Sequence, residues 1–145
     1  MMSRADLPIV WVAALLVLVL AGCQPKGHGT AIVRGKITYK GKPVPNGTIN
    51  FIPANSGPSA MGNIQPDGSY TLTTYKSGDG AVIGEHKVFI VAMEDLGNRL
   101  PEQRTPLPPP IVPVKYTSLA TSDLKATVEN KENTIDFDLQ GEPGK

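Results

Sequence analysis

From residue 31 onward, the chain consists of short runs of alternating apolar and polar residues, separated by glycine, proline, asparagine and aspartate. Alternation with a period of two is typical of a β-strand that buries one face, and no window shows the longer period and the caps of an amphipathic helix. The run 31–40, for example, places a mostly apolar set of side chains opposite a mostly charged set. About seven such runs in one domain predict an all-β fold, a single sandwich of two sheets.

Turn signals separate these runs. In 66–68, proline presets the first turn torsion and glycine accepts a positive φ, so a hairpin is expected there. The run 85–93 is apolar on both faces, which predicts a central strand covered on both sides. The last run is expected to bury Ile135, Phe137 and Leu139 and to expose the polar residues between them. The predicted strands span 31–40, 47–52, 61–65, 70–74, 85–93, 124–128 and 134–139.

The N-terminal residues have a different character. Arg4 leads into a continuous apolar stretch at 8–20, and two small residues then precede Cys23, the only cysteine of the chain. This arrangement looks like the lipobox of a bacterial lipoprotein, in which the thiol is acylated and the cysteine becomes the new N-terminus. The alternative is a retained transmembrane helix, but the apolar stretch is shorter than the ~20 residues that cross a bilayer. We therefore expect residues 1–22 to be a cleaved signal segment and Cys23 to carry lipid.

The residues that follow the lipobox indicate how the rest of the chain is organised and where the protein is located. Residues 23–30 are polar and rich in turn formers, so we expect a flexible tether before a domain that spans 31–140, followed by a disordered tail at 141–145. Gln24 stands where aspartate favours retention at the inner membrane in enteric bacteria, so the outer membrane is expected more than the inner membrane. The formal net charge is +1, which provides no basic field to attract nucleic acid.

A proline-rich segment, 101–113, lies in the long connection between the predicted central and penultimate strands. Three consecutive prolines favour an extended polyproline conformation. We expect a stiff link that carries Val114 and Tyr116 back to the core. The alternative is a docking segment for the aromatic groove of a partner, because long connections in compact domains are often functional.

Several motifs are similar to those of one known family. They are VRGKITYKGKPVP at 33–45, FIP at 51–53, DGSY at 67–70, GDGA at 78–81, GEHKV at 84–88, KY at 115–116, TSDL at 121–124 and ENTIDF at 132–137. Together they resemble small bacterial lipoproteins with a carboxypeptidase regulatory-like domain. The resemblance implies an Ig-like, transthyretin-like (prealbumin-like) β-sandwich, a diacylated thiol and an acylated amine at Cys23. It also implies that Tyr39, Phe51, Tyr70 and Phe137 fill the space between the sheets.

The pattern predicts a non-enzymatic protein of the cell envelope, tethered to a membrane through Cys23. It would bind an envelope protein or polysaccharide, or contribute to envelope structure. No catalytic residue, metal ligand, cofactor or small-molecule substrate is predicted. The alternative is an enzyme similar to the transthyretin-like hydrolase of purine breakdown, whose paired histidines and C-terminal Tyr-Arg-Gly-Ser motif are not matched here. The chain has only His28, expected to be exposed in the tether, and His86, expected to be packed and hydrogen-bonded.

Two further chemistries are disfavoured by the pattern. An isopeptide bond, as in pilus-like adhesive domains, needs a buried lysine, whereas alternation points Lys36 toward solvent with Arg34 and Thr38. Calcium binding at Asp67 or Asp79 is less expected than a turn that each isolated aspartate closes through nearby backbone.

The charged residues of the first and last strands predict one contact. Arg34 and Lys36 share a face of the first strand, and Asp136 and Asp138 are expected to point outward from the last. If these strands are neighbours, the cations would face the carboxylates. Exposed pairs of this kind contribute about 0.2–1 kcal/mol and discourage edge-to-edge aggregation.

Overall fold

The computed structural model describes residues 28–95, 97 and 108–142, so the predicted signal segment and Cys23 lie outside the described residues. This part of the chain forms short strands and one 3-10 turn, η2 (Val114–Tyr116), and it contains no helix long and apolar enough to cross a membrane. The strands are β1 (Thr30–Ala31), β2 (Val33–Tyr39), β3 (Lys42–Pro43), β4 (Thr48–Pro53), β5 (Ala60–Asn63), β6 (Ser69–Thr71), β7 (Ala81–Val82), β8 (Gly84–Val91), β9 (Lys125–Val128), β10 (Asn133–Thr134) and β11 (Phe137–Leu139).

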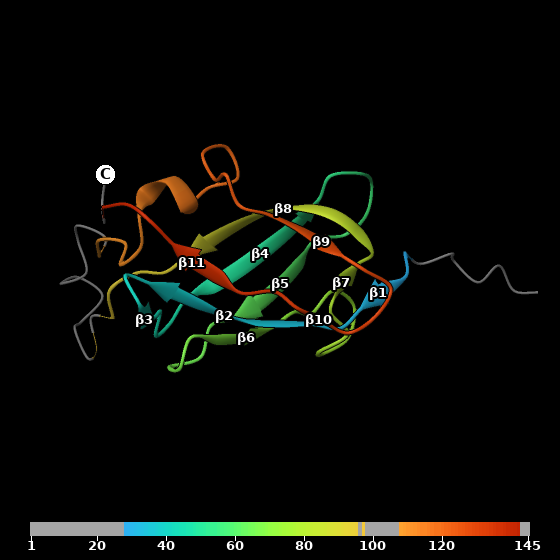
Figure 1. Ribbon diagram of the computed structural model, residues 1–145, viewed down its shortest axis with the longest axis horizontal. Helices are drawn as coiled ribbons and strands as arrows, with labels where there is room; N and C mark the ends of the chain where they lie inside the picture. Colours follow the sequence, from blue (N-terminus) through green and yellow to red (C-terminus); the bar gives the residue numbers. More distant parts are fainter. Residues whose placement is uncertain (1–27, 96, 98–107, 143–145) are drawn as a thin grey trace, which may run out of the picture.

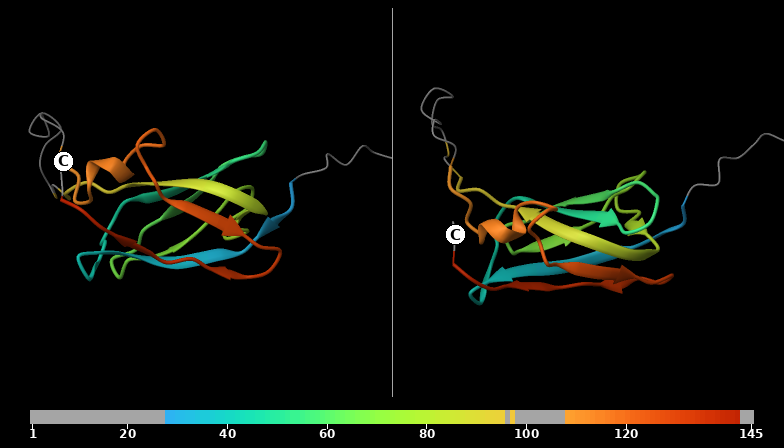
Figure 2. Two further views of the ribbon diagram at one scale, coloured as in Figure 1. Left: turned by 45° about the horizontal axis from the view of Figure 1, so that its top comes forward. Right: turned by 90° about the horizontal axis from the view of Figure 1, so that it is seen from above.

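Two sheets pack face to face, as Figures 1 and 2 show. In the first sheet, β10 and β11 run parallel to β2 along one side, and β6 and β3 run antiparallel to it along the other. The second sheet has the strand order β5-β4-β8-β9 with antiparallel pairing throughout. A short antiparallel pair, β1 with β7, lies at the end of the sandwich where the chain enters. The predicted all-β sandwich is confirmed.

The core lies between the sheets, because alternate residues of each strand point inward. The inward residues of β2, β4, β8 and β11 are Val33, Ile37, Ile49, Phe51, Val88, Ile90, Phe137 and Leu139, all buried. The ring of Phe51 lies 6.5 Å from that of Tyr70 and 6.2 Å from that of Phe137, centroid to centroid. Three of the four predicted aromatic residues therefore fill the core. The fourth, Tyr39, is half-buried and donates a hydrogen bond to the Gly141 carbonyl (2.9 Å).

The central strand β8 differs from the prediction on its outer face. It does lie between β4 and β9, and its inner side chains Val88 and Ile90 are fully buried. Its outer side chains Phe89 and Val91 are only half-buried, and Met93, just beyond the strand, is exposed. The expectation of cover on both sides is wrong because the sandwich has two layers, so the outer face of this sheet meets solvent.

The predicted strand 70–74 is divided between the two sheets. Only its first part pairs with β2, as β6. Thr73 instead forms an antiparallel bridge with Met61 of β5, with hydrogen bonds of 3.0 and 2.9 Å. The chain thus crosses from one sheet to the other at this point, which joins the two layers along one side.

The proline-rich connection returns to the core, although not at both predicted residues. Tyr116 is 4 % exposed and its hydroxyl donates to the Gln140 carbonyl (3.2 Å), as expected of a returning segment. Val114 is 40 % exposed, and Val112 fills the core in its place. The register differs because Pro110 bridges to Met93, which sets the alternation of the residues that follow. Residues 101–107 lie outside the described part.

The ends of the described domain extend slightly past the predicted boundaries. β1 begins at Thr30, inside the predicted tether, because Thr30 pairs with Val82. At the other end, the predicted tail begins at residue 141, yet Glu142 forms an ion pair with Lys40 (3.6 Å).

Candidate functional site

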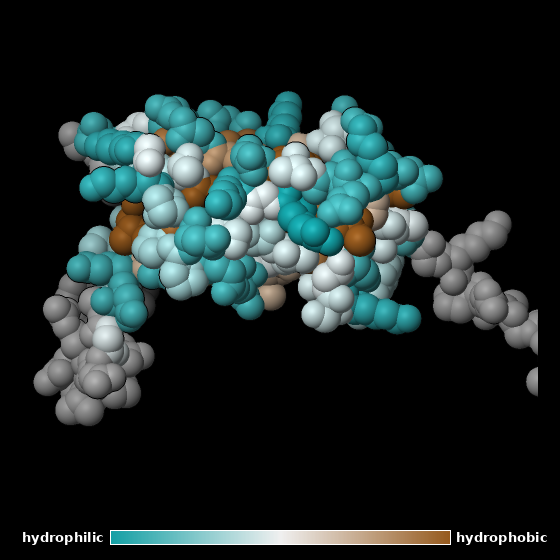
Figure 3. Space-filling model, turned by 60° about the horizontal axis from the view of Figure 1, so that its bottom comes forward, coloured by the Kyte–Doolittle hydropathy of each residue, from teal (hydrophilic) through white to brown (hydrophobic). Residues whose placement is uncertain are grey.

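A groove of about 930 Å³ lies over the outer faces of β2 and β6 and extends to β5. Figure 3 brings the side of the molecule that carries β6 forward and shows that most of its surface is hydrophilic. Because side chains alternate along a strand, the outward residues of β2 and of its neighbours gather on this face. The groove is therefore formed by residues far apart in the chain, from β2, β5, β6 and the segment around β10.

Strand register aligns the groove side chains in two rows. In one row, Arg34 lies between Thr71 of β6 and Thr134 of β10. In the other, Lys36 is paired with Ser69 of β6, and Asp136 follows β10 on its other side. Hydroxyl, cationic and carboxylate groups thus lie side by side across three strands, within reach of one extended polar ligand.

Most charged side chains in and beside the groove have an ion-pair or hydrogen-bond partner within the protein. Arg34 pairs with Glu132 (3.0 Å), and one carboxylate oxygen of Asp136 accepts the backbone N–H of Lys36 (2.7 Å). Asp138 accepts a hydrogen bond from the Thr38 hydroxyl (2.8 Å). The first and last strands are neighbours, as the predicted contact required. Arg34 nevertheless pairs with Glu132 and not with Asp136 or Asp138, because the parallel register places Arg34 beside β10.

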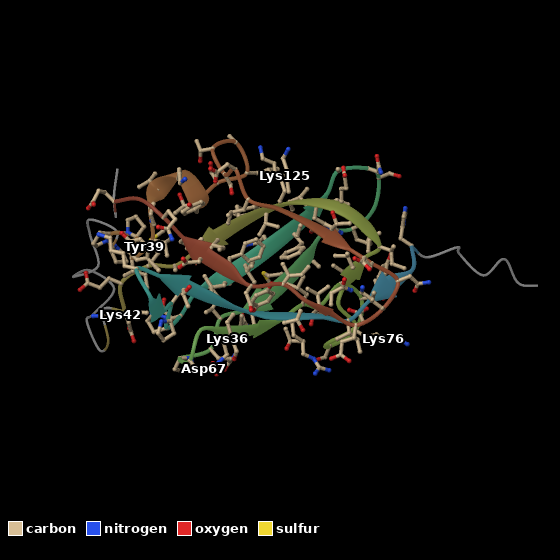
Figure 4. All side chains as sticks on the ribbon, viewed as in Figure 1. Lys36, Tyr39, Lys42, Asp67, Lys76 and Lys125 are labelled. Carbon is tan, nitrogen blue, oxygen red and sulfur yellow. The ribbon has the colours of Figure 1, made fainter. Side chains whose placement is uncertain are left out.

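The Lys36 ammonium points away from the core, as alternation predicted, and has no ion-pair partner among the residues described. It lies near Asp67, as Figure 4 shows. The Ser69 hydroxyl (2.6 Å) and backbone N–H (3.0 Å) donate to Asp67 and hold the pKa of its carboxyl below the usual range, with a smaller contribution from Lys36. Asp67 is therefore occupied in closing the hairpin turn, as predicted, while the ammonium of Lys36 is available to a ligand.

The backbones of β5 and β6 form one wall of the groove. The hairpin of β5 and β6 is closed at one end by the bridge between Met61 and Thr73 and at the other by the turn 65–69. Between these points Asn63 and Thr71 are opposite each other in register, but β5 and β6 form no ladder there. Hydrogen bonds alternate in direction along an antiparallel strand, so the backbone groups of both residues point away from their sheet neighbours. A Cβ at Gly62 would lie 2.7 Å from the Thr71 carbonyl oxygen, so β5 and β6 approach each other closely here and leave no space for an added strand.

The two histidines are not part of the groove. His86 is 2 % exposed, its Nε2 lies 2.6 Å from the Val82 carbonyl oxygen, and its ring packs 5.6 Å from that of Phe51. The prediction of a packed, hydrogen-bonded ring is confirmed. Its Nδ1 has no partner in the part that the structure describes. His28 is exposed beside Gly57, also as predicted.

Asp79 is the second aspartate whose role the structure defines. Its carboxylate accepts the backbone N–H groups of Thr74 (2.7 Å), Tyr75 (3.0 Å) and Lys76 (3.0 Å). Partial desolvation alone would raise the pKa of Asp79, but the three N–H groups outweigh it and hold the pKa below its usual range. The predicted turn-closing role is confirmed. Across residues 28–95, 97 and 108–142, no three His, Cys, Asp or Glu side chains are grouped so that they could hold a metal ion.

Comparison with known proteins found no family model, no curated protein and no solved structure that matches this chain. The carboxypeptidase regulatory-like family therefore stays a prediction.

The groove could not be predicted from the sequence, because its two rows of side chains depend on which strands are neighbours. The available signal was the set of outward polar residues on the first and last predicted strands.

Proposed function

We propose that the protein is a non-enzymatic, lipid-anchored protein of the bacterial cell envelope, whose β-sandwich binds another envelope macromolecule through the groove. The anchor is Cys23, in the lipobox-like sequence, and Gln24 favours the outer membrane over the inner membrane. The observation that supports binding most strongly is the groove itself, in which two rows of polar side chains lie next to each other.

The chemistry of the groove suits a polar chain, either a polypeptide segment or an envelope polysaccharide. Such a ligand presents repeated hydrogen-bond donors and acceptors, and the groove offers hydroxyl, cationic and carboxylate groups at the spacing of neighbouring strands. A shallow polar groove gives modest affinity because each new hydrogen bond replaces one with water. Tethering to the membrane compensates, since it holds the domain at a high effective concentration beside other envelope components.

Site-specific photo-crosslinking in the native envelope tests this proposal. A photoreactive residue at Thr71 lies in the groove, and the matched control at Thr127 lies on β9 in the other sheet and is also exposed to solvent. We expect one recurrent product from position 71 and none from 127. Mass spectrometry of that product identifies a protein, and sensitivity to glycan-degrading enzymes identifies a polysaccharide.

A groove-filling variant provides the second arm of this test. Ser69→Trp places a large side chain in the groove, whereas Thr127→Trp places the same side chain on the far sheet. The crosslink from Thr71 should be lost in the first variant and kept in the second. Equal products from positions 71 and 127, or no effect of Ser69→Trp, would contradict binding through the groove.

A further inference from the structure

Two lysines lie side by side on the outer face of the second sheet. Register places Lys87 of β8 directly opposite Lys125 of β9, and Ile52 of β4 directly opposite Lys87 on its other side. Residues opposite each other in an antiparallel pair share one face of the sheet. His86 and Val88, on either side of Lys87, are buried between the sheets, so all three side chains point outward. We call Ile52, Lys87 and Lys125 the outer row.

Neither lysine of the outer row is neutralised by an ion pair in the part of the chain that the structure describes. Two carboxylates lie close to them in the chain. Glu85, two residues before Lys87, is on the same face but forms no ion pair among the described residues, and Asp123 pairs with Lys115 (3.3 Å). Like charges directly opposite each other in a sheet are destabilising. Negative charge brought to this face from outside would relieve that repulsion.

Apolar side chains accompany the two lysines. Ile52 is half-buried within the outer row, and Phe89, two residues after Lys87 on the same face, is half-buried as well. The stems of the lysines add further apolar surface, because a lysine can lay its methylene groups on an apolar surface while its ammonium reaches polar groups. Cations beside apolar side chains are typical of a surface that binds anionic membranes, where head groups attract the cations and acyl chains meet the apolar area.

The outer row lies within reach of the proposed lipid at Cys23. Cys23 and His28 are five residues apart in the sequence, and five fully extended residues span at most about 18 Å. His28 lies against Gly57, in the loop that follows β4, and Ile52 is five residues before Gly57, next to the end of that strand. The chain therefore enters the domain at the end of the second sheet that carries the outer row.

We infer that the outer row docks the anchored domain on the surface of an anionic phospholipid membrane. Lys87 and Lys125 contact the phosphate groups, and Ile52 and Phe89 contact the boundary between head groups and acyl chains. This inference rests on the proposed lipid anchor at Cys23, which holds the domain beside the bilayer. Each lysine near an anionic surface shifts the ratio of docked to undocked domain about fivefold.

Docking through the outer row leaves the groove open to the envelope space. Lys125 and the groove residue Lys36 lie on opposite sides of the molecule in Figure 4, and the sheets that carry them pack face to face. Thr127 lies on the same outer face as Lys125, opposite Glu85. A photoreactive residue at Thr127 therefore meets head groups and not a protein or polysaccharide, which keeps it a control for binding in the groove.

Tryptophan fluorescence of the lipidated protein in vesicles tests the inference. The only tryptophan of the chain is Trp11, in the predicted signal segment, so the mature protein has none. Thr127→Trp introduces a single fluorophore beside the outer row. Its matched control, Thr71→Trp, introduces one in the groove, and both threonines are exposed strand residues. Each variant is reconstituted into vesicles of phosphatidylcholine, alone or with phosphatidylglycerol, and acrylamide is added to the water to quench the accessible probe.

We expect phosphatidylglycerol to protect the probe at position 127 from acrylamide and to leave the probe at position 71 accessible. High salt should remove the protection, because it screens the lysines from the lipid phosphates. Equal protection at the two positions would overturn the inference. So would protection of position 127 that is as strong in phosphatidylcholine alone, because the face would then be covered by something other than anionic lipid, such as a second copy of the chain.

Charge-neutral variants assign the effect to the outer row. Lys87→Gln combined with Lys125→Gln should remove the protection of position 127. The matched control is Lys42→Gln combined with Lys76→Gln, which removes the same charge from the side of the molecule opposite Lys125 in Figure 4 and should leave the protection in place. Protection that survives the first pair of substitutions, or is lost equally in both pairs, would contradict docking through the outer row.

Flotation of the same vesicles separates this inference from the proposed anchor. Wild-type protein that floats with phosphatidylcholine vesicles while the two probes respond alike refutes docking and leaves the anchor standing. Wild-type protein that stays at the bottom of the gradient refutes the lipid anchor, and with it the docking that depends on it.

Discussion

Replacing Gly35 with alanine is expected to destabilise the fold severely, because β2 and the segment that joins β10 and β11 approach each other closely there. A Cβ at this position would lie 1.8 Å from the Ile135 carbonyl oxygen and 2.6 Å from its carbon. The backbone after β10 would have to retreat by about 1.5 Å to restore ordinary van der Waals contact. The same carbonyl accepts the Tyr70 hydroxyl (2.6 Å), so the retreat also breaks a buried hydrogen bond.

The magnitude follows from these two effects. Overpacking against backbone costs about 1–3 kcal/mol, and a buried hydrogen bond left unmade costs about 1–3 kcal/mol more. The sum, about 2–6 kcal/mol, is a large part of the 5–15 kcal/mol that stabilises a typical domain. The free energy of unfolding is measured by urea denaturation of the chain that begins at residue 24, followed by circular dichroism.

Gly29→Ala is the matched control. A Cβ at Gly29 would meet only Ile83 Cδ1, at 3.6 Å, which is ordinary contact. Its free energy of unfolding should stay within about 0.5 kcal/mol of wild type. A Gly35→Ala protein that loses less than about 1 kcal/mol would refute the close approach of β2 to the segment that joins β10 and β11.

Three further predictions address the turn between the sheets, the buried tyrosine and the anchor. Asn133→Ala removes side-chain hydrogen bonds to the backbone of Glu129 (2.9 and 3.0 Å) and Lys131 (2.6 Å), and should lower the free energy of unfolding in urea by about 2–4 kcal/mol. The exposed control Asn130→Ala should lower it by less than about 0.5 kcal/mol. Burial, with a contribution from Asp136, raises the pKa of Tyr70, so above about pH 10 the folded protein keeps a proton that the unfolded chain loses. The free energy of unfolding should therefore fall as the pH rises above about 10, and Tyr70→Phe should reduce this fall. Cys23→Ser should move the protein to the soluble fraction or leave it unprocessed on gels, and a mature-sized product still in the membrane fraction would contradict the anchor.

Local pattern predicted the strands well, because alternation depends only on which residues are neighbours in the chain. In the last run, Phe137 and Leu139 are buried and Asp136 and Asp138 are exposed, as period two requires. Ile135, also predicted to be buried, is only half-buried, because the run is divided between β10 and β11 at this point. The packed state of His86 was predictable for the same reason, since it shares a register with the apolar residues of β8.

Features that depend on pairing between distant segments could not be predicted. The partner of Arg34 is Glu132 because β10 lies parallel to β2, and nothing local in either segment indicates that register. The groove has the same origin, since its rows combine β2, β6 and β10. The outer face of β8 was misjudged because an apolar outer face suggests cover that a two-layer sandwich does not provide.

Intact-mass spectrometry of the protein extracted from membranes is the most direct test of the proposed lipid anchor at Cys23. We expect a chain that begins at Cys23 and is heavier than residues 23–145 by a diacylglyceryl group and an amide-linked acyl chain. An unmodified mass, or a chain that still begins at Met1, would contradict it.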